Sequence, residues 1–180
     1  MTDSAFDEAL RVFAAERKYH GATVDRWLQL QSGDGAALLD LARELRLGEN
    51  QLRDLWEWAD DIAARDGLSL AQILTSDPVA AALRSQVSRN DRLKRVKDTL
   101  RRLRFPQLTA IEERLAGLVR ALALPQSVRL TFPEGLEGDA VRVEVVAESA
   151  AALRAAAARL HAAADTDACA EIFTLLREAP

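Results

Sequence analysis

The chain has 180 residues, of which 49% are hydrophobic and 29% charged, with a net charge of −4 at pH 7. This length and composition favour a globular protein over a disordered one. No apolar run approaches the roughly 20 residues of a membrane span, so we expect no membrane partner. The N-terminus lacks the basic segment followed by an apolar segment that marks a secretory signal. The single cysteine, Cys169, excludes an intrachain disulfide, and both features suit the cytoplasm.

Charge is unevenly distributed along the chain. Residues 1–78 carry 8 Lys and Arg against 15 Asp and Glu, a net charge of −7. Residues 84–104 carry 9 against 2, a net charge of +7, and residues 105–180 carry 7 against 11, a net charge of −4. The sequence therefore predicts an acidic helical module over residues 1–86, a basic linking helix over 87–106 and a third domain over 107–180.

Hydrophobic periodicity predicts helices through most of the acidic module. Their expected positions are residues 4–19, a segment from Thr23, 36–47 after a break at 32–35, 48–67 capped by Gly67, and two short segments from Ser69 and Asp77.

The segment LLDLARELRLGENQLRDLW, residues 38–56, has the pattern of a helix-turn-helix. Ala42 is the small residue required where the helices cross, and Leu47 is the apolar residue of the turn. Arg46 stands where such turns usually have glycine. The second helix offers three side chains able to contact base edges, Asn50, Gln51 and Arg53, but also three carboxylates that would repel phosphate, Glu49, Asp54 and Glu57. A DNA-reading helix and an acidic hairpin used only for packing both remain open.

Trp56 and Trp58 lie two residues apart on the same predicted helix, so their side chains diverge by about 200°. We expect one in the core and the other at a partner-binding surface, since Trp is enriched in protein contacts.

Residues 88–104, SRNDRLKRVKDTLRRLR, form a basic helix with a narrow apolar seam that includes Leu93, Val96 and Leu100. Cations flank the seam on both sides, which disfavours a parallel self-paired coil. Either the seam packs on the acidic module and its flanking cations meet carboxylates there, or the outward cations contact phosphates. The candidate DNA contacts are Arg89, Arg92, Lys94, Arg95, Lys97, Arg101, Arg102 and Arg104.

A second apolar seam follows over residues 108–122. After it, the spacing of apolar residues changes from the helical period to alternation, a period of two. Residues 128–132 and 141–145 alternate apolar and polar side chains around a Gly-containing turn, which predicts a β-hairpin with one buried face. Two helices follow, one beginning at Ser149. Since an isolated hairpin is barely stable, it must pack on these helices or pair with another chain.

Signals of catalysis are absent. His20 and His161 have no metal-ligand neighbours at suitable spacing, and no glycine-rich loop is placed to bind phosphate. We therefore expect no catalytic residue, no metal, no cofactor and no enzymatic activity.

Residues 108–160 combine a helix ending in a short loop, a strand beginning with Val, a charged turn, a Val-rich strand and a Ser-capped helix with spaced leucines. This order resembles the C-terminal dimerisation domain of the ParB family of chromosome and plasmid partition proteins. It covers under a third of the chain, and the upstream helix-turn-helix and linker also resemble that family's order. The family's nucleotide-binding domain has no counterpart, so no CTP site is carried over.

The resemblance implies a homodimer and DNA contact near the C-terminal domain that does not depend on sequence. The hairpins would pair across the two-fold axis and the last helices would pack on them, with the interface residues Val128, Leu130, Val141, Val143, Leu153 and Leu160. The outer face of the hairpin offers only Arg129 and Arg142, fewer cations than a DNA-binding sheet of this family would carry.

The expected fold is mostly α: an N-terminal helical module with a helix-turn-helix-like pair, then a small α+β (αββα) dimerisation domain. The leading hypothesis is a non-enzymatic, dimeric, ParB-like DNA-binding protein. The alternative is a protein–protein adaptor that recruits a partner through an acidic helical face and an exposed Trp, with no DNA binding.

Overall fold

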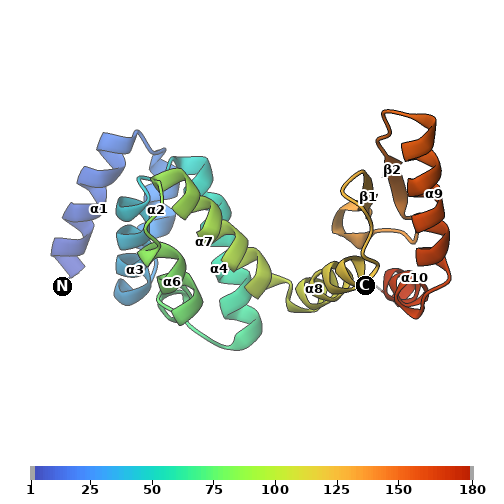
Figure 1. Ribbon diagram of the computed structural model, residues 1–180. Helices are drawn as coiled ribbons and strands as arrows, with labels where there is room; N and C mark the ends of the chain where they lie inside the picture. The colour runs from blue at the N-terminus through green and yellow to red at the C-terminus, as the bar shows by residue number, and fades with distance from the viewer. Residues whose placement is uncertain (1–2, 179–180) are drawn as a thin grey trace. The chain divides into compact units, whose positions relative to one another are not determined.

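The computed structural model describes residues 3–178 and divides the chain into two compact units, Met1–Arg104 and Phe105–Pro180 (Figure 1). The described residues are mostly helical with one two-stranded antiparallel sheet, so the predicted fold class is confirmed. The first unit contains α1 (Asp3–Arg17), α2 (Gly21–Leu28), α3 (Ser32–Glu44), α4 (Glu49–Asp66), α5 (Leu70–Leu74), α6 (Asp77–Arg84) and α7 (Arg89–Arg104).

One apolar core holds the first unit together. Trp27 and Trp56 are fully buried at its centre with their rings 6.1 Å apart. The seam of α7 enters the same core, where Val96 and Leu100 are fully buried and Leu93 is nearly so. The basic helix, expected as a link between modules, is therefore an integral helix of the first unit.

Local signals explain where several helices begin and end. Gly67 adopts a left-handed conformation, φ 66°, directly after α4, as the predicted C-terminal cap requires. Ser69 caps α5 by accepting a hydrogen bond from the Gln72 amide at 3.1 Å.

The predicted break at residues 32–35 is wrong, because these residues form the first turn of α3. Each glycine costs roughly 0.5–1 kcal/mol in a helix relative to alanine, and burial of Leu38, Leu39 and Leu41 on α3 offsets that cost. Gly35 is also required by packing: a Cβ at this position would lie 2.6 Å from Cζ of the buried Phe6 ring.

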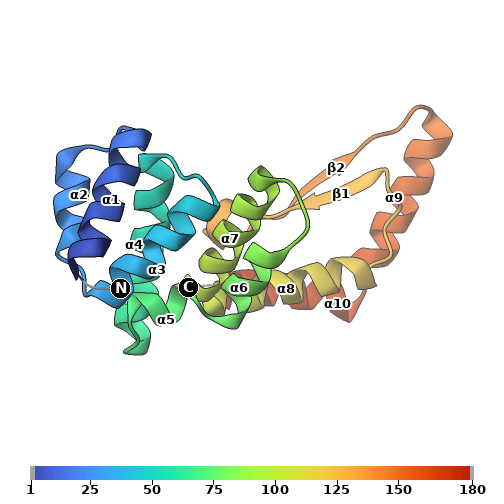
Figure 2. The ribbon, with the colours of Figure 1, turned by 90° about the vertical axis from the view of Figure 1, so that its left-hand side faces the viewer.

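The second unit contains α8 (Pro106–Ala121), β1 (Val128–Thr131), the 3-10 helix η1 (Glu134–Leu136), β2 (Arg142–Val145), α9 (Ala150–Ala164) and α10 (Asp167–Glu178). The strands lie side by side as a hairpin (Figure 2). Val128 pairs with Val145, and Leu130 with Val143, so the apolar residues share one face as predicted. A separate apolar core forms around Leu115, Leu122 and Ile172.

Replacing Gly35 by Ala should lower the free energy of unfolding by about 1–3 kcal/mol, because the new methyl group displaces the Phe6 ring inside a packed core. Gly33 is the matched control: it lies in the same helical turn, and a methyl group added there would meet nothing within 4 Å. Gly33→Ala should leave stability unchanged or raise it by up to about 1 kcal/mol. Urea unfolding followed by tryptophan fluorescence measures both, and equal effects would contradict the packing account.

Candidate nucleic-acid interface

Cations on both flanks of the α7 seam form ion pairs with carboxylates of α3 and α4. Arg92 lies 3.4 Å from Glu44, Lys97 lies 3.1 Å from Asp54, and Arg104 lies 2.6 Å from Asp61. At the N-terminal end of α7, Arg89 donates to the carbonyls of Leu45 and Arg46, both at 3.2 Å. The flanking cations therefore meet the acidic module, as the first of the two alternatives predicts.

The side of α7 opposite the seam carries more cations than carboxylates, with Asp91 and Asp98 exposed beside Lys94 and Arg95. Lys94 and Arg95 are exposed, and in the described part of the chain neither has a hydrogen-bond or ion-pair partner. Arg102 is exposed and Arg101 half-buried on the same helix. We call Lys94, Arg95, Arg101 and Arg102 the α7 ridge. Packing on one side of α7 and a cationic surface on the other thus occur together.

The two residues that the sequence pattern selects between α3 and α4 are buried. Ala42, within α3, and Leu47, in the turn before α4, are both fully buried. Arg46 has φ 46° and so adopts the left-handed conformation for which these turns usually use glycine.

Two of the three carboxylates near the start of α4 have structural roles. Glu49 accepts hydrogen bonds from the His20 amide, at 3.3 Å to each carboxylate oxygen, and from the Thr23 hydroxyl, which joins α4 to α2. Asp54 pairs with Lys97. The third carboxylate, Glu57, is exposed and has no hydrogen-bond or ion-pair partner in the described residues. The expected repulsion of phosphate is weaker than the charge count suggests.

The exposed side of α4 is narrow, which limits its use as a DNA-reading helix. On one edge Asp60 pairs with Arg26 of α2 at 3.1 Å, and on the other Asp54 pairs with α7. The Gln51 side chain accepts from the Gly48 amide at 3.2 Å, so one of the three predicted base contacts is used as a cap. Asn50 and Arg53 are exposed. Because neighbours hold α4 on both edges, it is poorly placed to enter a major groove along its length.

The two tryptophans of α4 separate as expected into one buried and one partly exposed side chain. Trp56 is fully buried beside Trp27, with the Arg26 guanidinium 4.2 Å from its ring centroid. It therefore belongs to the core and not to a partner-binding surface. Trp58 is half-buried, and Lys97 Nζ lies 5.9 Å from its ring centroid, in the range of a cation–π contact.

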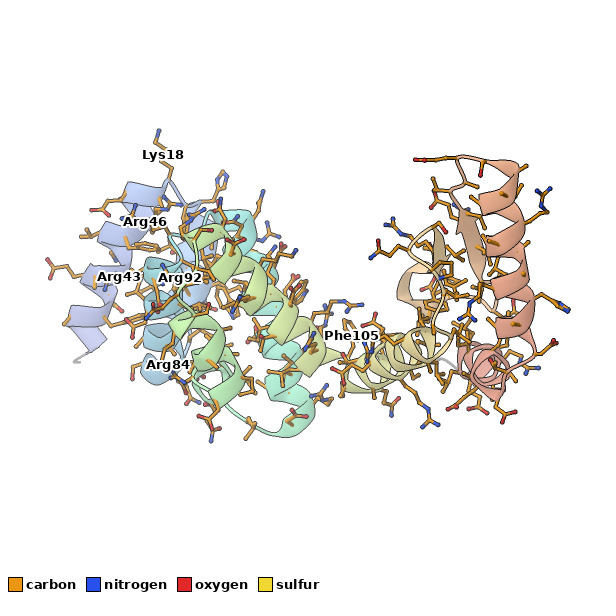
Figure 3. All side chains as sticks on the ribbon, viewed as in Figure 1. Lys18, Arg43, Arg46, Arg84, Arg92 and Phe105 are labelled. Atoms are coloured by element: carbon orange, nitrogen blue, oxygen red, sulfur yellow. The ribbon has the colours of Figure 1, made fainter. Side chains whose placement is uncertain are left out.

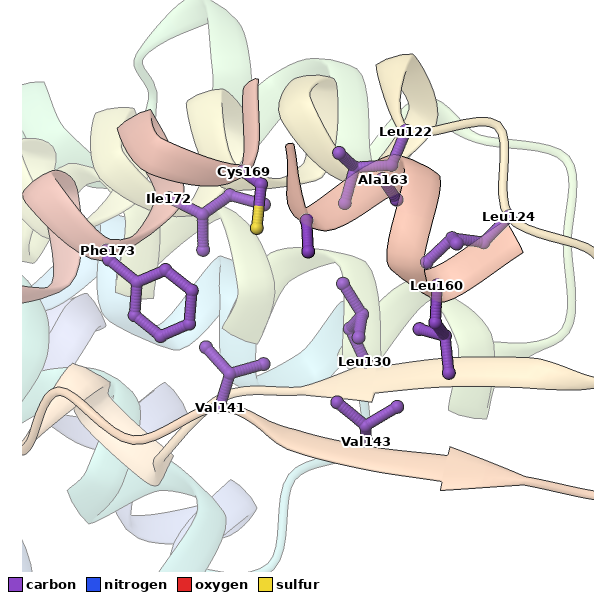
Figure 4. Close-up of a pocket in the computed structure, with 11 residues that line it drawn as sticks. Leu122, Leu124, Leu130, Val141, Val143, Leu160, Ala163, Cys169, Ile172 and Phe173 are labelled. Carbon is purple, nitrogen blue, oxygen red and sulfur yellow. The ribbon is translucent and has the colours of Figure 1, made fainter. Parts of the chain in front are cut away.

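The second unit has an apolar cavity of about 340 Å³ between the hairpin and the last two helices (Figure 4). Four predicted interface residues line it: Leu130, Val141, Val143 and Leu160. Leu153 is 52% exposed outside the cavity, whereas Val128 is only 8% exposed. Val128 is therefore buried within the unit, which corrects its place in the predicted interface. Phe173 and Cys169, which the sequence pattern did not select, also line the cavity.

A second group of cations went unnoticed in the sequence. Figure 3 places Lys18, Arg43, Arg46, Arg84 and Arg92 on one face of the first unit, and we call these five residues the cationic face. They come from segments far apart in the chain, and three of them lie inside the stretch of net charge −7. The only sequence signal was Arg46 at a turn position that favours glycine.

None of the described helices is long and apolar enough to cross a bilayer. Within residues 3–178, no group of three or more His, Cys, Asp or Glu side chains could hold a metal ion. No protein family, curated protein or solved structure matches the chain.

The Thr23 hydroxyl, which donates to the Glu49 carboxylate, lowers the pKa of Glu49 below its ordinary value of 4.5. The stability that the Glu49 carboxylate contributes should therefore be fully present above about pH 4.5. It should be lost as the pH falls through the lower pKa that Glu49 has in the folded state. Glu49→Gln should be less stable than wild type at pH 7, and this difference should shrink as the pH falls below 4.5 and through the folded-state pKa of Glu49. The exposed Glu57→Gln is the control on the same helix. A difference for Glu49→Gln that stays constant with pH would exclude this role.

Proposed function

We propose that this chain is a non-enzymatic, homodimeric DNA-binding protein that contacts the phosphate backbone without reading base sequence, as the resemblance to partition proteins implies. The observation that carries the proposal is the two-sided character of α7. Its flanking cations are paired with α3 and α4, while Lys94 and Arg95 remain exposed without partners in the described residues.

Anchoring of this kind suits phosphate binding. A helix fixed by a buried seam presents its outward cations from a rigid backbone, so less conformational freedom is lost when they meet DNA. Phosphate contacts supply most sequence-independent affinity and release counterions. Base readout is a weaker expectation, since only Asn50 and Arg53 are exposed at the start of α4.

The apolar cavity of the second unit supports dimerisation. Val143, Leu153 and Phe173 are 47%, 52% and 42% exposed, respectively, and two of them line the cavity. Apolar surface of this kind gains free energy when a second copy covers it. Dimerisation also places two ridges on one DNA molecule, and the second then binds at a raised effective concentration.

The outer edge of β2 could pair with the same edge of a second copy, because opposite charges would then face each other. The Val146 amide donates to Ser127 at 2.8 Å. The alternating pattern therefore directs the amides of residues 141, 143 and 145 to the outer edge. If two copies pair antiparallel about Val143, Arg142 faces Glu144 of the second copy and Val141 faces Val145 of the second copy. Pairing about Glu144 would instead oppose like charges.

The adaptor hypothesis has one observation in its favour. Three cations of the basic helix are already neutralised by carboxylates of the same unit, so part of the +7 excess is used internally. The two hypotheses differ over Lys94 and Arg95, for which the adaptor hypothesis assigns no ligand.

Lys94→Gln with Arg95→Gln should weaken binding to a 30-base-pair duplex. In wild type, log affinity should fall steeply with log salt, and the variant's slope should be flatter by about 0.9 for each lost phosphate contact. Fluorescence anisotropy between about 50 and 200 mM salt measures the slope. Arg120→Gln with Arg154→Gln removes two exposed charges from the second unit and is the matched control.

Binding by wild type with an unchanged slope in the ridge variant would exclude the ridge as the contact. The absence of wild-type binding even at 50 mM salt would exclude DNA binding and favour the adaptor.

Val143→Glu should prevent dimerisation, because it places a carboxylate on the apolar face that a second copy would cover. Since Val143 is 47% exposed, the isolated unit should tolerate the change. Val12→Glu is the matched control, as Val12 is a 54% exposed valine of the first unit. Sedimentation equilibrium should give about 40 kDa for wild type and Val12→Glu, twice the 19.8 kDa chain, and about 20 kDa for Val143→Glu. A wild-type mass near 20 kDa at micromolar concentration would exclude the dimer.

A further inference from the structure

Hydrogen bonds and an ion pair bring the segments of the cationic face together. Arg17, at the end of α1, donates to the Arg46 carbonyl at 2.7 Å and to the Leu47 carbonyl at 2.9 Å. Arg89, at the start of α7, donates to the Arg46 carbonyl at 3.2 Å. Arg92 pairs with Glu44. The carbonyl end of α3 thus attracts arginines from two other helices, as the partial negative charge there favours.

The balance of charge on these segments is positive. Residues 16–18, 40–46 and 84–92 carry seven basic side chains, Arg17, Lys18, Arg43, Arg46, Arg84, Arg89 and Arg92, against four carboxylates, Glu16, Asp40, Glu44 and Asp91. Lys18, Arg43, Arg46 and Arg84 are exposed or partly exposed. Six of the seven are arginines, whose planar guanidinium can donate two parallel hydrogen bonds to a phosphate.

Two of these cations occupy backbone positions that stability alone would give to glycine. Lys18 has φ 57° and Arg46 has φ 46°, both in the left-handed region that costs free energy for a residue with a Cβ. Neither side chain has a hydrogen-bond or ion-pair partner among residues 3–178 that would offset this cost. Both residues close the C-terminal end of a helix, since the Tyr19 amide donates to the Ala14 carbonyl at 2.9 Å and the Leu47 amide donates to the Ala42 carbonyl at 3.0 Å. Glycine is the usual residue at such a cap, and a Lys or Arg there places a long cationic side chain at the helix end instead.

We propose that the cationic face binds the phosphate backbone of DNA, so that the DNA path includes the α1–α3 side of the first unit as well as the α7 ridge. The two surfaces are continuous, because Arg95 lies one helical turn beyond Arg92 and residues three apart on a helix are neighbours. This inference rests on the proposed function and identifies the part of the first unit that carries it. Lys18 and Arg46 serve binding at the expense of stability.

The decisive variant is Lys18→Gly with Arg46→Gly. Glycine relieves the left-handed strain, so the urea midpoint should stay the same or rise, while the salt slope of duplex binding should be flatter by about 1.8. At 0.1 M salt that corresponds to a loss of affinity of up to roughly sixtyfold. Arg120→Gln with Arg154→Gln is again the control and should bind like wild type.

A second variant, Arg43→Gln with Arg84→Gln, keeps the test valid if the glycine variant does not fold, and it should weaken binding in the same way. The inference is overturned if wild type and both face variants bind duplex with equal affinity and slope while the ridge variant is weakened; the proposed function then stands. If wild type binds no duplex at 50 mM salt, both the proposed function and this inference are overturned.

Discussion

The architecture of the first unit depends on one contact: the packing of the α7 seam against α4 and α6. Leu93, Val96 and Leu100 bury an apolar stripe in a helix that is otherwise strongly basic. Burial of these side chains supplies free energy, whereas the exposed ion pairs beside them contribute about 0–1 kcal/mol each. The ion pairs therefore act mainly on orientation. By pairing Arg92 and Lys97 inward, they leave Lys94 and Arg95 facing solvent.

The same constraint accounts for the acidic composition of the first 78 residues. Several carboxylates there are used as internal partners: Glu44, Asp54 and Asp61 pair with α7, Glu49 holds the start of α2, and Asp34 accepts from the Ala71 amide at 2.7 Å. These groups neutralise cations or cap helices within the unit. The net charge of the segment therefore misrepresents the surface, on which cations gather around the carbonyl end of α3.

Much of the fold could be predicted because its signals are local. The Gly67 and Ser69 caps, the α7 seam and the alternation in the hairpin each depend on a few neighbouring residues. The failures concern residues whose surroundings come from elsewhere in the chain. The turn at residues 32–35 looked like a loop because nothing nearby reveals that Phe6 packs against Gly35. Val128 was placed at an interface because periodicity cannot tell which of two faces a distant helix will cover. For the same reason the sequence did not tell which of Trp56 and Trp58 is the core residue. The cationic face was missed for the same reason, since its members meet only through tertiary contacts.

The three lysines of the chain allow a direct test of the account. Lys94 belongs to the α7 ridge, Lys18 to the cationic face, and Lys97 is paired with Asp54 as an internal reference. Amine acylation of the full chain, with and without saturating duplex and read by mass spectrometry, reports the accessibility of each. Bound DNA should slow the acylation of Lys94 and Lys18 severalfold and leave that of Lys97 nearly unchanged. Equal rates at Lys94 with and without bound duplex would contradict it.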